Sequence, residues 1–438
     1  MTSEQQRVVV IGGGLAGLRV AARLGAGVTV LGEESHSPYN RVLLAEVLAG
    51  RYAPEVIALP APGPALRRGV RAVRIDRAEQ VVHCDDGTVE PYSTLVLATG
   101  SNPVLPALRG LFEPEGRELP QGVHAFRTMD DCLALSAAVR PGVRAVVIGG
   151  GLLGVSAARA LAERGAQVVL AQQGERLMER QLDAEASALL RTHLTGLGVE
   201  IHTECRVRGL STADTSQNPA PPAFEAGGTP GGSWGRVRAE PGTPRRVTGV
   251  ELADGYRLDA DLVVLACGVR PRTGLAQAAG LDVGTGILVD DELRTSDARI
   301  HAIGDCAEHA GRVYGLAGPA LEQADALAGV LLGTGQGITT QPAYGGTRAL
   351  TRLTLTAGGD HPLDLAAFGE TTPLPGDDVV RLTDATRRTY RKVVVRGDRL
   401  VGGVLLGELS SVGALARSWE DSESLTDLFH LLTDDGGS

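Results

Sequence analysis

The sequence predicts an α/β protein: two doubly wound parallel-sheet domains, then a small α+β domain. Two glycine-rich loops each follow an apolar strand and open a helix, which is the repeating unit of such a sheet. From about residue 343 the pattern changes to short alternating strands, which favours a separate third domain. A chain of 438 residues is long enough to form these cores.

The first glycine loop follows the apolar strand Arg7–Ile11. A GxGxxG loop at this place indicates a Rossmann-like dinucleotide-binding domain. Its first glycine makes the turn, its second lets the backbone approach the pyrophosphate, and its third lets helix and strand pack closely. The free N–H groups at the helix start add partial positive charge. The expected ligand contacts come from Gly12, Gly14, Leu15, Ala16 and Gly17.

Carboxylates stand at the end of the next predicted strand. Glu33 and Glu34 follow Val28–Leu31, where a carboxylate can accept hydrogen bonds from both ribose hydroxyls. A further buried strand ends in the small residues Thr99 and Gly100, and this turn is expected beside the diphosphate of the same ligand.

An aspartate identifies that ligand as FAD. The segment Thr295–Asp305 ends in Gly304 and Asp305, where the carboxylate bonds the ribityl chain of a flavin. In isolation such an aspartate would more simply cap a helix. In this order after the glycine loop, it predicts FAD in the first domain.

The second glycine loop predicts a site for NAD(P)H. Gly149, Gly151 and Gly154 repeat the loop after an apolar strand, and the next strand ends at Gln172. An acidic residue at that place favours NAD. The Gln172 side chain can still form a hydrogen bond with a ribose hydroxyl, and Arg176 could bind the 2′-phosphate of NADP. NADH and NADPH therefore both stay open, as does a retained fold with poor nucleotide binding.

Composition excludes several classes of function. A net charge of -10 argues against nucleic acid as a partner, because phosphate binding needs a basic face. The apolar runs are shorter than a membrane span, and the polar start does not resemble a signal peptide, so a cytoplasmic protein is expected. The five cysteines show neither CxxC nor metal-ligand spacing, which excludes a dithiol centre or an iron–sulfur centre.

The domain boundaries follow from these patterns. We predict a first part of the FAD-binding domain over 1–122 and its second part over 254–336. The NAD(P)-binding domain takes 123–253, and the α+β interface domain takes 337–438. A Ser-, Pro- and Gly-rich stretch over 211–245 is interpreted as a flexible insertion on a hairpin, with a partner-docking loop as the alternative.

Several longer motifs resemble one family. The chain is similar to two-dinucleotide-domain flavoprotein reductases of the pyridine nucleotide-disulfide oxidoreductase class. It most resembles the flavin module of NAD(P)H-dependent nitrite reductase large subunits, and also rubredoxin and ferredoxin reductases. The motifs that carry the resemblance are Tyr39–Leu44, Arg176–Asp183, Gly268–Leu275, Tyr314–Leu316 and Tyr390–Val395.

The resemblance implies further contacts to the cofactors. It assigns Arg41 to the FAD phosphates, the backbone of Val73 to the adenine, and Arg127 to the flavin nucleotide. Gly268, which opens one of the shared motifs, is expected at the cofactor as well.

The sequence also departs from the family near the nicotinamide. Many relatives carry a lysine and a glutamate that pair there, and these positions are Glu46 and Ser156 in this chain. A catalytic thiol between Arg41 and Leu44, as in related peroxidases and NADH oxidases, is also lacking. The departure raises the question of whether hydride transfer is weakened.

The resemblance implies an FAD-dependent NAD(P)H oxidoreductase that passes electrons to a separate iron–sulfur or nitrite reductase protein. FAD carries out the chemistry, so no catalytic acid or base is assigned. The alternatives are a ferredoxin or rubredoxin reductase outside nitrogen assimilation, and a non-catalytic FAD-binding subunit with a redox-sensing or scaffold role. No metal and no membrane partner is expected.

Overall fold

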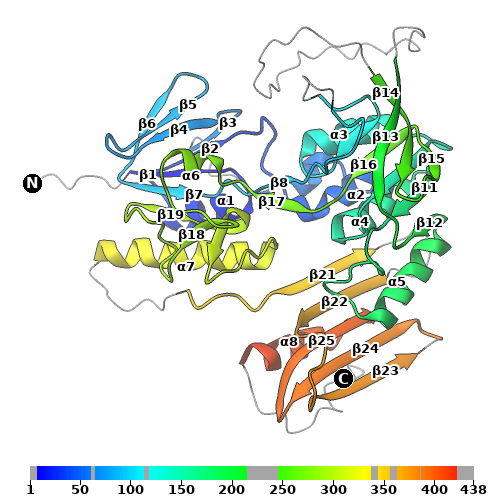
Figure 1. Ribbon diagram of the computed structural model, residues 1–438. Coiled ribbons are helices and arrows are strands. Elements are labelled where there is room, and N and C mark those ends of the chain that lie inside the picture. The colour runs from blue at the N-terminus through cyan, green and yellow to red at the C-terminus, as the bar shows by residue number, and fades with distance from the viewer. Residues whose placement is uncertain are drawn as a thin grey trace, which may run out of the picture. The chain divides into compact units, whose positions relative to one another are not determined.

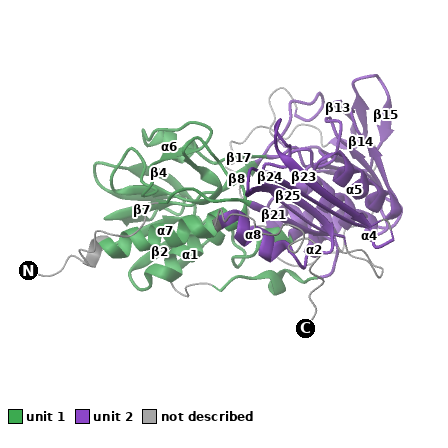
Figure 2. Ribbon diagram, turned by 90° about the horizontal axis from the view of Figure 1, so that it is seen from below, with its two compact units in different colours: residues 1–43, 52–102, 269–349 green, residues 44–51, 103–268, 350–438 purple. Residues whose placement is uncertain are grey.

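The computed structural model describes residues 7–60, 65–112, 118–214, 245–336, 344–355, 363–384 and 386–421. The chain divides into two compact units, coloured separately in Figure 2. Unit 1 comprises residues 1–43, 52–102 and 269–349, and unit 2 comprises residues 44–51, 103–268 and 350–438. The first glycine loop and Asp305 lie in unit 1. The second glycine loop and most of the C-terminal domain lie in unit 2.

Unit 1 is built on a parallel sheet with the strand order β19-β7-β1-β2-β3. Successive residues of the buried central strand β1 face opposite sides of the sheet, because side chains alternate along a strand. Val10 packs with the helices α1 and α7, which contact each other on one face (Figure 1). Val9 packs on the other face with Ile75 and Val82 of a small antiparallel sheet, β4-β5-β6. The sheet therefore lies between a helical layer and a second sheet.

The elements of unit 1 are β1 (Val8–Ile11), α1 (Leu15–Leu24), β2 (Val28–Gly32), η1 (Arg41–Leu43), η2 (Pro54–Ile57), β3 (Leu66–Arg68), β4 (Ala72–Asp76), β5 (Val81–Cys84), β6 (Val89–Pro91), β7 (Thr94–Leu97), α6 (Gly274–Ala278), β18 (Ile287–Val289), β19 (Ile300–Ala302), η5 (Gly304–Cys306), β20 (Ala307–His309) and α7 (Ala317–Gln336). The strands β8 (Ser101–Pro103) and β17 (Val269–Pro271) pair where the chain passes between the units.

Unit 2 contains a second parallel sheet, in the order β12-β11-β10-β16-β9. Its elements are α2 (Leu44–Leu48), β9 (Val123–Ala125), α3 (Met129–Ala138), β10 (Arg144–Ile148), α4 (Leu152–Glu163), β11 (Gln167–Ala171), α5 (Ala184–Gly196), β12 (Val199–His202), β13 (Val207–Asp214), β14 (Arg245–Leu252), β15 (Arg257–Asp259) and β16 (Leu262–Leu265). The predicted α/β class with two dinucleotide-binding folds is confirmed.

The predicted insertion falls on the hairpin of β13 and β14, which pair antiparallel. Residues 211–214 and residue 245 belong to these two strands. The rest of the insertion, residues 215–244, lies outside the described residues.

The C-terminal domain of unit 2 is an antiparallel sheet in the order β21-β22-β25-β24-β23. Its elements are β21 (Leu350–Leu355), β22 (Leu363–Gly369), β23 (Asp378–Asp384), β24 (Thr389–Arg396), β25 (Arg399–Gly407) and α8 (Val412–Asp421). The strands β24 and β25 form a hairpin, in which Arg396 pairs with Arg399 and Gly397 has a φ of 65°. Trp419 of α8 packs on Phe368 in the core of this domain.

One half-buried carboxylate joins the C-terminal domain to the second glycine-loop domain. Asp183 caps the start of α5 through the backbone N–H of Ala186 at 3.0 Å. It also accepts hydrogen bonds from Lys392 Nζ at 2.8 Å and from the Tyr390 hydroxyl at 2.7 Å. Burial would raise the pKa of Asp183, but these donors hold it below its usual value. The sequence motifs Arg176–Asp183 and Tyr390–Val395 therefore contact each other here.

No helix within the described ranges is both long and apolar enough to cross a membrane.

Candidate functional site

The first glycine loop has the backbone that a pyrophosphate site needs. Gly12 has a φ of 124°, and a Cβ there would overlap the carbonyl of Ala98. A Cβ on Gly17 would overlap the carbonyl of Gly12 in the same way. Gly14 differs from both, because no described atom lies within 4 Å of the place its Cβ would occupy. The loop is therefore closed by its first and third glycines and open to a ligand at its second.

The helix that follows this loop has an uncapped start. Gly14 is the N-cap of α1, and no side chain of the described residues caps it. Leu15 and Ala16 are the first helical residues, so their N–H groups belong to the end that lacks intrahelical partners. The oxygens of a phosphate can accept hydrogen bonds from such groups.

Asp305 lies beside this helix, although it is far away in sequence. Its turn, η5, begins at Gly304, where φ is 75° and an added Cβ would lie 3.3 Å from the Cβ of Ala16. Gln323 of α7 fixes the turn by accepting the Gly304 N–H at 2.7 Å. Ser101 donates its hydroxyl to the Asp305 carboxylate at 2.9 Å. The structure thus brings the two predicted flavin motifs together in unit 1.

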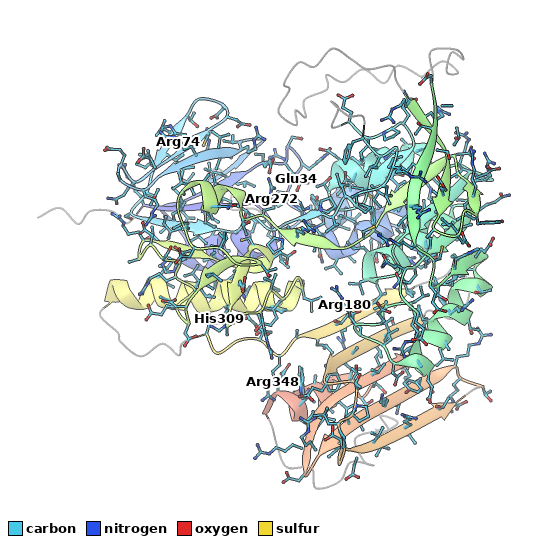
Figure 3. All side chains as sticks on the ribbon, in the orientation of Figure 1. Glu34, Arg74, Arg180, Arg272, His309 and Arg348 are labelled. Atoms are coloured by element: carbon cyan, nitrogen blue, oxygen red, sulfur yellow. The ribbon has the colours of Figure 1, made fainter. Side chains whose placement is uncertain are left out.

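The two predicted ribose carboxylates are each held by an arginine. Glu33 pairs with Arg272 at 2.6 Å. Glu34 pairs with Arg41 and accepts the Tyr39 hydroxyl at 2.7 Å. Burial lowers the pKa of Arg41, but the carboxylate of Glu34 more than offsets this and the pKa is raised. Figure 3 shows Glu34 and Arg272 in the same part of unit 1.

The remaining predicted FAD residues of unit 1 lie at a turn and at a β-bulge. Thr99 donates its hydroxyl to the Arg272 carbonyl at 2.9 Å, and Gly100 has a φ of 72°. Val73 lies at the β-bulge of β4, where the pairing shifts between Ala72 and Arg74. A bulged residue leaves the ladder, which is consistent with the predicted backbone contact to the adenine.

The second glycine loop repeats the geometry of the first. Gly149 has a φ of 110°, and a Cβ there would overlap the Ala266 carbonyl. A Cβ on Gly154 would overlap the carbonyl of Gly149, whereas no described atom lies within 4 Å of one on Gly151. Gly268 has a φ of 100° and equally open surroundings. Unit 2 thus has a complete second dinucleotide loop.

The side chain of Gln172 forms a hydrogen bond with this loop. Its side-chain oxygen accepts the Gly150 N–H at 2.7 Å, and its side-chain nitrogen donates to the Arg176 carbonyl at 3.3 Å. The amide oxygen is thus engaged with the loop, but it carries no negative charge. The charge that would repel a 2′-phosphate is absent from this position.

Ser156 and Arg127, which the sequence analysis singles out, each form a hydrogen bond with a residue four positions away in the chain. Ser156 donates its hydroxyl to the Leu152 carbonyl at 2.8 Å, within its own helix. The backbone N–H of Arg127 donates to Asp131 at 3.0 Å, beside the start of α3 in unit 2. The role of Arg127 at the flavin nucleotide stays a prediction.

Glu46 belongs to a closed ring of four charges that the sequence did not reveal. Arg159 pairs with Glu46 and, at 3.2 Å, with Glu163. Arg51 completes the ring, at 3.3 Å from Glu46 and 2.8 Å from Glu163. The Arg159 side chain is only 1% exposed. This ring ties residues 44–51 to α4, which explains why they belong to unit 2 although they interrupt the sequence of unit 1.

The cysteines are poorly placed for thiol chemistry. Burial raises the pKa of Cys132 and of Cys267 to about 11, so both thiols stay protonated near neutral pH. In the ranges that the structure describes, no group of three or more His, Cys, Asp or Glu side chains could hold a metal ion.

Comparison with known proteins identifies the family. The model of the family "Pyridine nucleotide-disulphide oxidoreductase" matches residues 6–324, and that of the rubredoxin NAD+ reductase C-terminal domain matches residues 362–421. The chain therefore belongs to the pyridine nucleotide-disulphide oxidoreductase family and is an enzyme of that family. Membership implies that it binds FAD and NAD(P)H.

Its relatives include proteins of nitrogen assimilation and of other electron-transfer systems. It is 32% identical over 93% of its length to a Bacillus subtilis nitrite reductase [NAD(P)H], of which it covers 46%. It is 32% identical to rhodocoxin reductase of Rhodococcus erythropolis, over 81% of this chain and 79% of that protein. The chain spans about half the length, or less, of the nitrite reductases it matches.

Solved structures support the same assignment. The covalent putidaredoxin reductase–putidaredoxin complex matches with a TM-score of 0.76 and 25% identity, over 98% of this chain and 96% of that chain. A ferredoxin reductase from Rhodopseudomonas palustris matches with a TM-score of 0.76 and 26% identity, over 97% and 98% of the two chains.

Proposed function

We propose that this chain takes electrons from NAD(P)H and passes them through FAD to a separate iron–sulfur protein or nitrite reductase component. One observation carries the proposal: among the described residues each unit has a glycine loop with an open second glycine, and the turn that carries Asp305 lies beside the loop of unit 1. Unit 1 is thereby suited to FAD and unit 2 to the nicotinamide dinucleotide.

The residues of the chain bind and orient the two cofactors. In unit 1, the loop and the start of α1 would hold the diphosphate, Glu33 or Glu34 the ribose, and Asp305 the ribityl chain. FAD held by these residues would supply the chemistry that converts hydride transfer from NAD(P)H into single-electron release. No side chain is assigned as an acid or a base, and the ring around Glu46 leaves that carboxylate engaged with Arg159.

A reductase outside nitrogen assimilation is the second candidate. Rhodocoxin reductase matches over most of both chains, whereas the nitrite reductases extend far beyond the match. The matches to ferredoxin reductases favour a ferredoxin as the partner. A non-catalytic FAD-binding subunit is the alternative that the experiment has to exclude.

Anaerobic stopped-flow mixing tests the proposal. The full chain loaded with FAD is mixed with NADH and, separately, with NADPH, and the flavin absorption band is followed. Rapid bleaching supports the proposal, and no bleaching over minutes supports the non-catalytic subunit. A second mixing step with a [2Fe–2S] ferredoxin, or with a sirohaem protein plus nitrite, then identifies the type of acceptor from its rate of reoxidation.

A further inference from the structure

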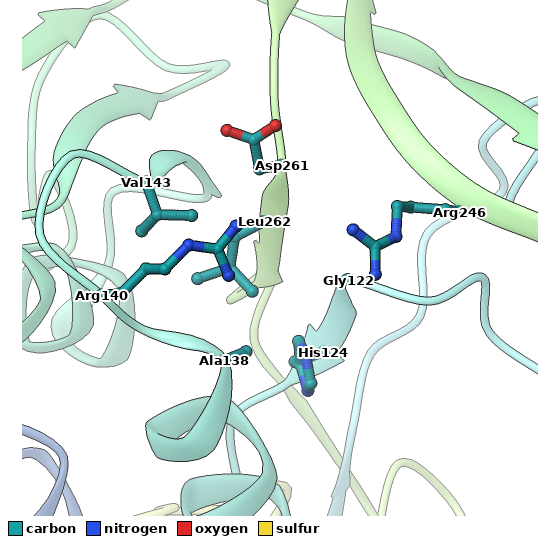
Figure 4. Close-up of a pocket in the computed structure, with 8 residues that line it drawn as sticks. All are labelled: Gly122, His124, Ala138, Arg140, Val143, Arg246, Asp261 and Leu262. Atoms are coloured by element: carbon teal, nitrogen blue, oxygen red, sulfur yellow. The ribbon is translucent and has the colours of Figure 1, made fainter. Parts of the chain in front are cut away.

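A polar cavity of about 160 Å³ lies in unit 2, away from the glycine loop (Figure 4). Its walls come largely from segments that lead into three neighbouring strands, β9, β10 and β16. The lining residues are Gly122, His124, Ala138, Arg140, Val143, Arg246, Asp261 and Leu262.

This cavity is at the edge of the sheet opposite the dinucleotide loop. The strands β9, β16 and β10 are parallel, so their amino-terminal ends share one edge. The loop Gly149–Gly154 follows the other end of β10. At 3.3 Å per residue, the length of that strand separates the two places by about 15 Å. The cavity is therefore not part of the pyrophosphate site.

Two positive charges face this cavity. Arg140 and Arg246 extend their guanidinium groups into it from opposite walls, as Figure 4 shows. Asp261 is already engaged by Arg144, which donates to its two oxygens at 2.9 and 3.1 Å. This hydrogen bonding holds the pKa of Asp261 below its usual value.

In the ranges that the structure describes, neither Arg140 nor Arg246 forms an ion pair, although the charge of Arg140 acts on the nearby Asp261 carboxylate. Two guanidinium groups facing one small cavity repel each other, and an anion between them would remove that repulsion. Such a pair is notable in a chain whose net charge is -10.

The backbone holds the walls in place. The Val247 N–H donates to the Gln121 carbonyl at 2.9 Å, which fixes the strand next to Arg246. The Arg140 carbonyl accepts the Val143 N–H at 3.1 Å. Gly122 has a φ of 83°, and a Cβ there would lie 2.6 Å from the Asp261 carbonyl oxygen, so the wall approaches closely at that point. Burial lowers the pKa of His124, which leaves a neutral ring with one N–H to donate.

We propose that this cavity binds a small oxyanion of the size and charge of phosphate, held between Arg140 and Arg246. A planar guanidinium donates two parallel hydrogen bonds to an oxyanion, and two of them match a dianion. The volume of about 160 Å³ exceeds that of several waters at about 30 Å³ each but is below the roughly 300 Å³ that drug-sized ligands need. The lining of this cavity includes no residue of either dinucleotide loop.

Calorimetric titration of the FAD-loaded full chain with inorganic phosphate tests this site, with chloride keeping the ionic strength constant. Saturating NADP⁺ is present, so that phosphate cannot bind at the second glycine loop. We expect Arg140→Gln and Arg246→Gln each to weaken phosphate binding at least tenfold, the loss expected for one charge-assisted contact. Arg208→Gln is the matched control, since Arg208 is another exposed arginine of unit 2 but does not line the cavity.

The titration gives different results depending on whether or not the cavity binds phosphate. Binding that is lost in both cavity variants and kept in the control supports the site. Phosphate that fails to bind the unaltered chain, or that binds all four proteins equally, overturns it. Circular dichroism checks that each variant is folded. If a glutamine variant is unfolded, Arg140→Lys and Arg246→Lys replace it, and these should bind phosphate more weakly than the unaltered chain because they lack the paired donors.

Discussion

At the scale of single residues, we expect Gln172 to determine which nicotinamide nucleotide the second loop prefers. Its amide oxygen accepts the Gly150 N–H as a carboxylate would, but without the charge. Its position at the end of β11 is where a carboxylate selects against a 2′-phosphate. We therefore expect NADPH to be accepted along with NADH.

Gln172→Glu should shift this preference toward NADH. The added charge would repel the 2′-phosphate, and we expect the ratio of kcat/KM for NADH to that for NADPH to rise at least tenfold, or about 1.4 kcal/mol. Steady-state kinetics with both nucleotides measure it. Gln173→Glu is the control, because Gln173 is the exposed neighbour. Equal ratios in the two variants would rule out the role of Gln172.

The second glycine of each loop gives a matched pair of tests. Gly14 and Gly151 both have open surroundings and ordinary negative φ values, so a valine should fold at either place but block the ligand. We expect Gly14→Val to bind FAD at least tenfold more weakly, with thermal stability close to that of the FAD-free chain. Gly151→Val should keep FAD and lose its bleaching by NAD(P)H. Absorption spectra before and after reductant distinguish the two, and a reversed pattern would contradict the assignment of the loops.

At the scale of elements, the ring of Glu46, Arg51, Arg159 and Glu163 fixes α2 on α4. Arg159 is buried, and without Glu46 only Glu163 in this ring would offset the charges of Arg159 and Arg51, at a cost of about 3 kcal/mol. Glu46→Lys, which restores a residue type common in the family, should therefore lower the Tm by roughly 6 °C or more. Glu55→Lys at an exposed position is the control. A Tm equal to that of the control would show that the ring contributes little.

The Asp183 contact gives a prediction about pH. Because the folded pKa of Asp183 is lowered, its ionised form stabilises the fold above its ordinary pKa of about 3.9, and this contribution is lost as the pH falls below that value. Asp183→Asn should thus be less stable than the unaltered chain at pH 7, and the difference should shrink below about pH 4. Denaturant unfolding at several pH values measures this. A difference that is constant with pH would contradict it, and Asp214→Asn at an exposed position is the control.

At the scale of the whole molecule, short sequence motifs predict those parts of the fold whose geometry depends on a few neighbouring residues. Both glycine loops, the turn at Asp305 and the hairpin at Gly397 depend on glycines with restricted roles, and each can be predicted from a short segment. The α/β class follows from the order of these segments.

Contacts between distant residues could not be predicted in the same way. The sequence shows Glu46 as a departure from the family, but only packing of α2 on α4 reveals Arg159 as its partner. Similarly, Arg272 is part of a recognisable motif, yet its pairing with Glu33 needs the folded sheet of unit 1. Such ion pairs depend on tertiary geometry, which neither periodicity nor spacing contains.

The central claim is that unit 1 holds a flavin. Titration of the purified full chain with FAD, followed by gel filtration and an absorption spectrum, tests it most directly. We predict a yellow protein that retains one FAD per chain. A chain that is folded by circular dichroism yet emerges colourless after incubation with excess FAD would contradict the account.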